Sequence, residues 1–532
     1  MVAKEDYDDI QGDIWPGLSK QYEAFYFFSI EDVALFRPVL KKLADSEITS
    51  ATHAMASRYA IQKVKAEQAK KKGEETKSKG AGGLFGLVES GFDLAGAVAH
   101  TAVDVTVGVA KFPIEFFEHL VPKDAKDIPR AKASPSHVGL AGVNISFTYV
   151  GMQKLWSEDP FDDLYIKGMQ QDMMGEGRDQ KEYWFKEFLK DEENGKPSKI
   201  DGMVLVCGTK EEVQDKVKYL EENYFGEKQG CRHIRTLDGQ ERPQPNRGHE
   251  HFGYLDGISQ PLLKGFDDED LKSKGARKFA TRPGVIIFGH DGEEEGMEWP
   301  DWARNGSIQV VRRLKQFVPE WNNFLVEQAP KFHLTADQLG ARVMGRWKSG
   351  APVQLHPDTD CPADAKLNDF DYDADCQLKC PFASHMRKTK PRIGVDNADK
   401  FDIMRRGLPF GPEHDPKTEP TKTTQDRGLM FVCYQTSLNN GFSFIKNKWC
   451  NLDNFPSNKE KFTGGILPGQ DPVIAQELPS TKQADDRSLT FSLTDGKGQH
   501  SQMVFPSFVH SQGGDYFFSP SLSLLRTLST AK

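Results

Sequence analysis

The feature that most constrains the fold of this chain is a series of short apolar segments of strand length, spread over most of its 532 residues. Runs of roughly four to eight apolar residues, rich in aromatic and β-branched side chains, are typical of buried strands. Apolar residues spaced three and four apart predict a helix over residues 211–223, and residues 61–72 are helix-like but highly charged. The predicted strands are residues 24–30, 142–150, 202–207, 284–288, 428–434, 441–445 and 515–518.

The order of these elements favours an α+β protein. Strands and helices do not alternate tightly, as they do in a doubly wound parallel sheet, and the sequence contains neither a Gly-x-Gly-x-x-Gly nor a Walker motif. We therefore expect antiparallel sheets.

The length of the chain indicates more than one core, because single hydrophobic cores stop growing near roughly 250–300 residues. The Pro- and Arg-rich stretch 241–248 predicts an N-terminal half, residues 1–245, and a C-terminal half, residues 246–532. Lys-, Glu- and Gly-rich residues 63–83 predict a solvated insertion at about residues 60–130. The apolar residues 84–120 predict either a helical hairpin packed on the body or a surface helix that meets a lipid or a partner.

Charge and the N-terminus bear on partners and location. A net charge of −9 argues against a nucleic-acid surface, because phosphate binding depends on clustered Lys and Arg. The first residues are acidic, whereas a secretory leader begins with basic residues and an apolar run. No segment reaches the roughly 18–20 apolar residues that a transmembrane helix requires. The sequence therefore predicts a soluble protein, either cytoplasmic or secreted after loss of a leader or by another route.

The seven cysteines are too few for a disulfide-rich scaffold. Cys361, Cys376 and Cys380 cluster near His385, which raises a zinc site as one interpretation. The paired Cys-x-x-Cys spacing of a strong zinc motif is missing, however. We expect buried or loop thiols, with at most one disulfide.

Two segments beyond the boundary carry candidates for chemistry. Residues 249–261 place Asp256 between apolar residues and glycines, where the backbone can approach another group closely, although a turn aspartate is the plainer interpretation. Residues 380–392 place His385 two positions before Arg387. This pattern is typical of an imidazole ligand with a cation nearby for an anionic cofactor group, although a lone histidine is more often structural.

Two further segments follow. Residues 403–412 contain Arg405 and Arg406 before a glycine turn, and residues 426–435 lead into an apolar run. Together, and in this order, the four segments resemble the dye-decolorising peroxidase family, most closely its fungal members. Gly253-Tyr-Leu-Asp-Gly257 matches the Gly-x-x-Asp-Gly motif of the family.

The resemblance covers most of the chain, from residues 10–14 through residues 345–352 to residues 513–518. It implies two ferredoxin-like halves with antiparallel sheets. It also implies one haem b per chain, held mainly by the C-terminal half.

The resemblance assigns roles residue by residue. His385 matches the proximal haem ligand, and Asp256 matches the distal acid–base residue. Arg405 matches the distal arginine, with Arg406 as the alternative one residue away. Arg387 is expected near the haem propionates.

Other matches concern access to the haem. Leu429 and Phe431 match the apolar pair that shapes the distal pocket and a narrow peroxide channel. Trp449 matches an exposed tryptophan that passes electrons from bulky substrates, with a structural tryptophan at a sheet edge as the alternative. A tyrosine that serves the same purpose in the family is replaced here by Phe410.

The predicted function is that of a haem peroxidase that uses hydrogen peroxide to oxidise dyes, phenols and similar aromatic reductants through a high-valent iron intermediate. Some fungal relatives also oxidise Mn(II), and the acidic residues 369–375 offer carboxylates for it. These residues lack the Gly and Glu of an EF-hand, so a solvated acidic loop is the plainer interpretation.

Two alternatives stay open. One is a haem-binding or haem-handling protein with incidental peroxidase activity. The other is a non-haem structural or membrane-associated protein built around residues 84–120. The presence of both Asp256 and Arg405 favours the peroxidase, because carrying haem requires neither.

Overall fold

The computed structural model describes residues 3–61, 141–157, 162–190, 199–267, 280–293, 299–476 and 488–531. Nearly all of the charged helix predicted at residues 61–72, and the whole of the apolar segment 84–120, lie outside the described residues.

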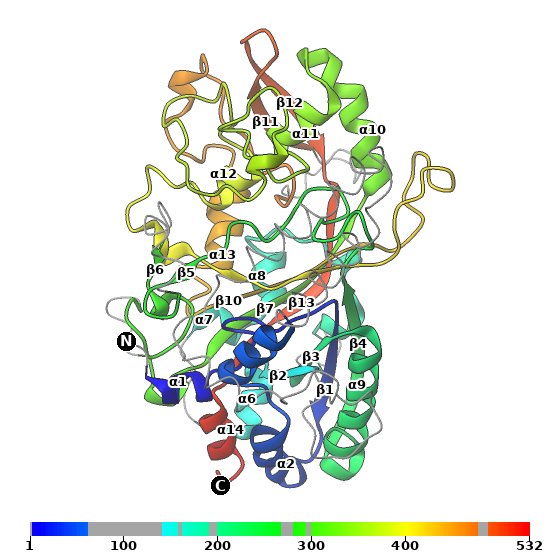
Figure 1. Cartoon of the computed structure of the whole chain (residues 1–532), viewed down its shortest axis with the longest axis vertical. Coiled ribbons are helices and arrows are strands. Elements are labelled where there is room, and N and C mark those ends of the chain that lie inside the picture. The colour runs from blue at the N-terminus through cyan, green and yellow to red at the C-terminus, as the bar shows by residue number, and fades with distance from the viewer. Residues whose placement is uncertain are drawn as a thin grey trace, which may run out of the picture.

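A nine-stranded antiparallel sheet forms the centre of the molecule (Figure 1). Its strand order is β4-β1-β3-β2-β13-β7-β10-β8, and β9 also pairs with β10. The strands are β1 (Tyr22–Ile30), β2 (Gly142–Phe147), β3 (Gly202–Gly208), β4 (Cys231–Gln240), β7 (Ser307–Gln316), β8 (Met404–Arg405), β9 (Leu408–Phe410), β10 (Gly428–Gln435) and β13 (Val509–Ser519).

This sheet runs through both halves of the sequence. Strands from the first half join strands from the second where Phe518 of β13 pairs with Phe147 of β2. The first strand of the order, β4, contacts β9 and β10 near the opposite edge, so the sheet curves until its two edges approach each other. The α+β class with antiparallel sheets is confirmed, and the division at residue 245 stays a prediction.

Local sequence explains why the outer helices form where they do. In α2 (Val33–Ser46), Asp32 accepts hydrogen bonds from the backbone N–H groups of Ala34 and Leu35, which fixes the first turn. In α9 (Lys210–Tyr224), Thr209 and Glu212 form a capping box. Helices α2, α9 and α14 (Leu522–Leu528) lie at the end of the molecule opposite the hairpin described below (Figure 1).

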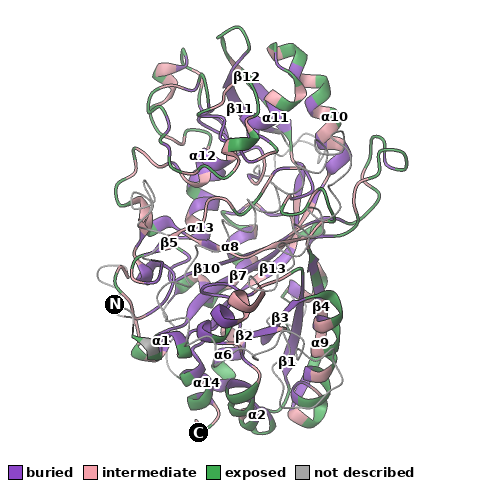
Figure 2. Cartoon of the chain, viewed as in Figure 1, coloured by how far each residue is buried: buried purple, intermediate pink, exposed green. Residues whose placement is uncertain are grey.

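A smaller layer covers the C-terminal part of the sheet. The hairpin of β11 (Ser488–Thr494) and β12 (His500–Pro506) shares an apolar core with α10 (Val318–Gln328) and α11 (Ala336–Met344). Trp321 of α10 is fully buried in that core. Figure 2 shows the strands of the central sheet largely buried and the outer faces of α2 and α9 exposed.

The remaining elements are short. A two-stranded parallel sheet joins β5 (Leu262–Leu263) to β6 (Ala280–Thr281). In the part of the chain that the structure describes, no helix is long and apolar enough to cross a membrane. Further α-helices are α1 (Lys4–Asp9), α6 (Tyr149–Leu155), α7 (Asp163–Lys167), α8 (Met169–Met174), α12 (His385–Thr389) and α13 (Phe442–Phe444), and residues 51–61 are also helical.

Five of the seven predicted strands are strands in the structure, and two predictions are wrong. Residues 284–288 contain a 3-10 turn, and residues 441–445 begin the helical stretch of α13, which continues as a π-helix over Ile445–Cys450. Both segments are buried, and a short buried run reads alike whether it is strand or helix. All seven cysteines are described and unpaired, so the structure has no disulfide among them.

Candidate functional site

A large cavity lies between the central sheet and α12. Every lining residue except Asp179 lies after residue 245. Its walls come from β7 and β10, from the loop 254–261, from α12 and from two segments at residues 401–405 and 473–476. Much of the lining is apolar, with cationic side chains at intervals.

His385 enters the cavity from the first position of α12. Its Nδ1 atom lies 2.8 Å from Oδ2 of Asp471, a carboxylate with no exposed surface. The other carboxylate oxygen, Oδ1, accepts hydrogen bonds from the backbone N–H groups of Val473 (2.8 Å) and Ile474 (3.2 Å). This support fixes the ring and leaves Nε2 of His385 as the nitrogen available to a ligand.

The pKa values of His385 and Asp471 reflect burial and the contact between the two side chains. Burial raises the pKa of Asp471, but the adjacent His385 and the two backbone donors outweigh burial and hold that pKa below its usual value. Burial lowers the pKa of His385, and the charge and hydrogen bond of Asp471 outweigh burial, so the net direction is upward. An imidazole held by a buried carboxylate is more electron-rich, which strengthens it as a metal ligand.

Asp256 lines the same cavity together with Arg405. Nη1 of Arg405 donates to Oδ1 of Asp256 over 2.7 Å, and Gly257 N–H donates to the same oxygen over 2.6 Å. Arg405 is itself fixed, because Nη2 donates to the Ser259 carbonyl (3.3 Å) and its backbone exchanges two hydrogen bonds with Gln260. A carboxylate and a guanidinium are therefore held side by side at the cavity surface.

The two adjacent arginines go to different places. Arg405 lies in β8, and its side chain reaches the cavity. The guanidinium of Arg406 turns away and donates to the backbone carbonyls of Asp13 (3.0 Å) and Ile14 (3.3 Å). Successive side chains point to opposite faces of a strand, so only one of the two can serve the cavity.

The ion pair sets the charge of Asp256. Burial raises the pKa of this carboxyl, but the charge and hydrogen bond of Arg405, with the Gly257 N–H, outweigh burial. The net pKa of Asp256 is below its usual value. At any pH above that range the cavity contains a carboxylate able to accept a proton.

Leu429 and Phe431 both line the cavity from β10. They are two residues apart, so they share one face of the strand, whereas Met430 between them is fully buried on the other. Their partners across the pairing with β7 are Leu314 and Arg312, which also line the cavity. The predicted apolar pair therefore forms a wall of the cavity beside Asp256 and Arg405.

Two further arginines, Arg346 and Arg392, line the cavity. Arg346, which is 7% exposed, donates to the backbone carbonyls of Gly350 and Leu367 and to the Asn368 side chain, all uncharged. Burial lowers the pKa of Arg346 to about 10, and the positive charge of the neighbouring Arg392 adds to that effect. These cations suit an anionic group in the cavity.

Arg387 lies elsewhere, and the expectation that it sits near the cofactor's anionic groups needs correcting. Its guanidinium donates to the backbone carbonyls of Cys376, Cys380 and Asp373, and its side chain lies over the rings of Tyr372 and Phe382. Arg387 is 3% exposed and is absent from the cavity lining. On the short helix α12 it points away from the face that carries His385.

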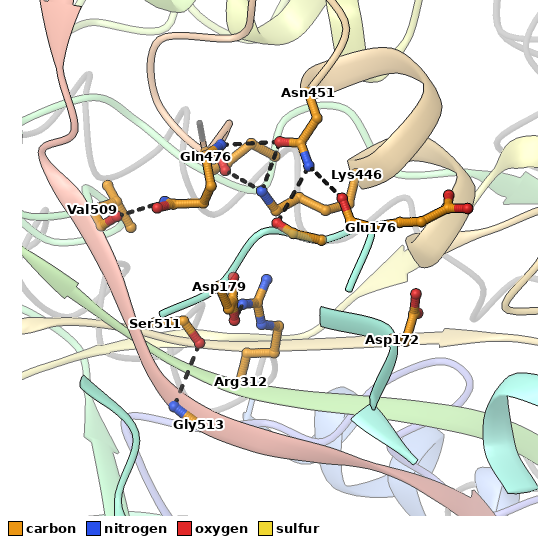
Figure 3. A network of polar contacts seen from close by, with 12 residues as sticks. Asp172, Glu176, Asp179, Arg312, Lys446, Asn451, Gln476, Val509, Ser511 and Gly513 are labelled. Carbon is orange, nitrogen blue, oxygen red and sulfur yellow. Dashed lines mark hydrogen bonds and ion pairs between the residues drawn. The ribbon is translucent and has the colours of Figure 1, made fainter. Parts of the chain in front are cut away.

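A network of polar contacts (Figure 3) contributes Asp179, Arg312 and Lys446 to the cavity lining. Arg312 forms an ion pair with Asp179, and both side chains are buried. Lys446 donates to Oδ1 of Asn451 (3.0 Å) and to the Ile474 carbonyl (2.8 Å). Burial lowers the pKa of Lys446 to about 8, against the opposing charge of Asp179.

Trp449 lies in the π-helix after α13 and is only 4% exposed, so the expectation of an exposed tryptophan is wrong. Its ring stacks on Phe455 at 5.2 Å and packs against Phe401 at 4.9 Å, measured between centroids. Phe401 lines the cavity, and Phe455 is partly exposed. Trp449 thus sits one ring from the cavity and one ring from the surface. Phe410 is buried under Arg313, at 3.6 Å.

The acidic residues 369–375 do not gather into one site. Phe370 and Tyr372 between the aspartates are buried, and the aspartates themselves are exposed. Asp373 pairs with Lys379 at 3.3 Å, and Asp375 pairs with Lys459 at 3.1 Å. Among the described residues, no group of three potential metal ligands forms in this stretch, nor does one form from Cys376, Cys380 and His385.

The sequence patterns did not identify Asp471, Arg346 or the polar network that contains Arg312, Asp179 and Lys446. Asp471 lies 86 residues after His385 and has no motif of its own, so only the fold brings the two together. Arg312 lies in β7, whose sequence SIQVVRRLKQ contains charged residues and therefore does not look like a buried strand. Its burial depends on the ion pair with Asp179. Arg346 lies in residues 345–352, one of the segments that carry the family resemblance, and this position was its one signal in the sequence.

Two family models and several individual relatives match this chain. The model described as the DyP dimeric alpha+beta barrel domain matches residues 9–88 and 117–243, and the model for the C-terminal part of Dyp-type peroxidases matches residues 263–467. A dye-decolorizing peroxidase of Exidia glandulosa is 30% identical over 98% of this chain and 87% of its own length. The dye-decolorizing peroxidase AauDyP1 of Auricularia auricula-judae is 30% identical over 97% of this chain and 86% of its own length.

Solved structures agree with these matches. An ancestral D-type dye-decolorizing peroxidase superposes with a TM-score of 0.74 at 33% identity, over 99% of each chain. A dye-decolorizing peroxidase in complex with 2,6-dimethoxyphenol superposes with a TM-score of 0.72 at 30% identity, over 99% of this chain and 100% of the other.

Proposed function

The chain belongs to the dye-decolorising peroxidase family and is a haem peroxidase, and on that premise we propose that His385 holds one haem b per chain while Asp256 and Arg405 handle hydrogen peroxide. The observation that carries the proposal is the placement of a carboxylate-supported histidine and a carboxylate–guanidinium pair in one largely apolar cavity.

The cavity suits a haem in three respects. His385 offers Nε2, because Asp471 occupies Nδ1. Apolar side chains such as Leu429 and Ile474 provide the surface that a macrocycle buries. Arg346 and Arg392 offer positive charge for carboxylate groups, which we assign to them in place of Arg387.

Bound haem would supply an iron centre for the two-electron reduction of peroxide, and reducing substrates would return those electrons one at a time. The residues of the chain prepare this reaction. Asp256, ionised because Arg405 holds its pKa low, accepts a proton from one peroxide oxygen and delivers it to the other. Arg405, a fixed fork of donors, stabilises negative charge that develops on the departing oxygen.

Leu429 and Phe431 narrow the cavity beside this pair, so we propose that peroxide reaches it whereas bulky dyes do not. Electrons from dyes then need a path through the protein. We place Trp449 on that path as an interior relay between Phe401 at the cavity and the partly exposed Phe455. Its burial excludes direct contact between Trp449 and a dye.

We propose phenols and dyes ahead of Mn(II) as reductants, because the carboxylates of residues 369–375 are spread out or engaged by lysines. Steady-state turnover of 2,6-dimethoxyphenol and of Mn(II), measured on the same preparation, tests that order. Turnover of Mn(II) equal to that of the phenol would overturn it. An extracellular location, which the resemblance implies, stays a prediction that fractionation of the source organism tests.

Haem titration tests the ligand assignment. Wild-type protein is expected to give a Soret band that saturates at about one haem per chain, whereas His385→Ala loses the band or retains haem only weakly. His414→Ala is the matched control, because the His414 ring bonds a backbone carbonyl outside the cavity and this variant should titrate as wild type. Normal haem binding by His385→Ala would refute the assignment.

A further inference from the structure

A second cluster of ligand-type side chains lies outside the haem cavity, on the long connection between α11 and α12 (Figure 1). His356, Cys361 and Asp364 each offer one ligand atom, and these atoms all lie within 4.8 Å of one another. Nε2 of His356 is 2.7 Å from Oδ2 of Asp364, and Sγ of Cys361 is 3.9 Å from the same oxygen. We propose that these three side chains bind a zinc ion, with water as the fourth ligand.

The donor set selects the metal. Imidazole nitrogen, thiolate sulfur and carboxylate oxygen together suit zinc, whereas Mn²⁺, Mg²⁺ and Ca²⁺ prefer oxygen ligands. Tetrahedral bonds of about 2.0–2.3 Å place such ligand atoms roughly 3.3–3.6 Å apart. The sulfur–oxygen separation here is within a few tenths of an ångström of that range, and the nitrogen–oxygen pair needs to open from hydrogen-bonding distance by less than 1 Å.

The connection that carries these ligands is held in place from several sides. Nε1 of the buried Trp347 donates to the His356 carbonyl over 2.7 Å. Nε2 of Gln338, on α11, donates to the Asp358 carbonyl over 3.0 Å. These bonds restrict the connection before a metal binds, which lowers the entropy lost on binding.

Metal binding here proceeds without redox change. Zinc displaces the thiol proton of Cys361, which passes to solvent, and His356 binds through Nε2 as a neutral ring whose single proton moves to Nδ1. His356 and Asp364 are partly exposed, with 26% and 40% of their side-chain surfaces accessible, so the ion has a route in.

The site adjoins the loop that carries Asp256. Gly350 has a φ of +103°, and a Cβ at that position would lie 2.5 Å from the Ala365 carbonyl oxygen and 3.0 Å from Cδ2 of Leu255. The segment after Asp364 and the loop before Asp256 thus pack on the same glycine. Zinc at Cys361 is expected to stabilise this wall of the molecule against unfolding.

Metal analysis of the haem-loaded protein tests the proposal, and it needs no peroxidase activity. After incubation with zinc and desalting, wild type should retain about one zinc per chain, with one sulfur at about 2.3 Å in zinc-edge X-ray absorption. Cys361→Ser should lose the retained zinc. Cys376→Ser is the matched control, because Cys376 is also half-buried on this connection but lies outside the cluster, and it should retain zinc as wild type does.

Alkylation supplies a second measurement that does not depend on a variant. Zinc should protect Cys361 from iodoacetamide by at least about tenfold in rate while leaving Cys376 unprotected, because only the bound thiolate is withdrawn from reaction. Equal zinc retention by Cys361→Ser and Cys376→Ser would overturn the proposal. So would a zinc spectrum without sulfur, or equal protection of the two cysteines.

Discussion

Removal of the Arg405 charge should move the acid limit of peroxide activation upward by about one pH unit. Nη1 of Arg405 lies 2.7 Å from Oδ1 of Asp256. Two unit charges about 4 Å apart attract each other by about 1 kcal/mol in water and by about 4 kcal/mol at an effective dielectric constant of about 20. Since Asp256 and Arg405 are 37% and 29% exposed, solvent screening places the interaction near the lower end, at about 1–2 kcal/mol.

That energy corresponds to about one unit of pKa, at about 1.36 kcal/mol per unit. The direction follows from the role of Asp256 as proton acceptor. The carboxylate is active above its pKa, which Arg405 lowers, and Arg405→Leu leaves burial to raise that pKa. The rate of reaction with peroxide should also fall by about 10²–10³, the usual cost of one lost electrostatic stabiliser.

Stopped-flow measurement of the Soret change after peroxide addition, repeated from acid to neutral pH, gives the assay. Arg405→Lys is the matched control, because it keeps the charge without the fork of donors. The lysine variant should lose part of the rate but keep the acid limit of wild type. An Arg405→Leu profile with an unshifted acid limit would show that the ion pair does not set the pKa of the reacting group.

Three further predictions concern the support of the iron ligand, the electron path and stability. Asp471→Asn should speed haem transfer to an excess of apomyoglobin by about 10–100-fold, because His385 loses a charged hydrogen-bond acceptor. Asp495→Asn is the control: it removes a carboxylate that does not line the cavity, and its rate of haem transfer should match that of wild type. Trp449→Phe should lower turnover of bulky dyes and leave the peroxide reaction unchanged in stopped flow; equal loss of both would remove Trp449 from the path. Burial raises the pKa of Glu419, but Arg427 and backbone donors outweigh burial and lower this pKa to about 2. The ionised Glu419 therefore stabilises the fold above the unfolded-state pKa of about 4.3, and this stabilisation is lost as the pH falls toward 2. Glu419→Gln should therefore cost about 3 kcal/mol of unfolding free energy at pH 7 in urea titration, and the deficit should vanish near pH 2; a deficit independent of pH would contradict this.

Much of the central sheet could be predicted from the sequence, because β1, β2 and β3 are buried along their whole length. All nine residues of β1 are buried, so the apolar run itself marks the strand. The prediction failed for β4 and β7, which carry charged residues. Arg312 is tolerated in β7 only because Asp179, from a distant loop, neutralises it.

The site could be predicted in part. Asp256 and His385 stand within motifs, and the structure brings both side chains to one cavity, whereas their roles stay predictions. Residues defined by long-range packing could not be found, and Asp471 is the clearest case. Arg387 shows the opposite failure, because proximity in sequence to His385 on a helix does not decide which face a side chain takes.

Trp449 shows why exposure is hard to read from sequence. Its neighbours Lys446, Asn447 and Lys448 suggest a surface segment, yet Lys446 and Asn447 are themselves buried and bonded within the molecule. The π-helical turn places the Trp449 ring inward against Phe401. The family match predicted an exposed ring, and the polar neighbours gave no signal that the segment turns inward.

The most direct test of the account is a single mixing experiment with Asp256→Asn. The variant should bind haem as wild type does, because Asp256 is not a ligand, and its Soret band should match before mixing. On addition of one equivalent of hydrogen peroxide, the wild-type band should shift promptly, and the variant should respond at least about 10²-fold more slowly, since its amide accepts no proton. A variant that reacts at the wild-type rate with a full complement of haem would contradict the assignment of Asp256 as the proton acceptor.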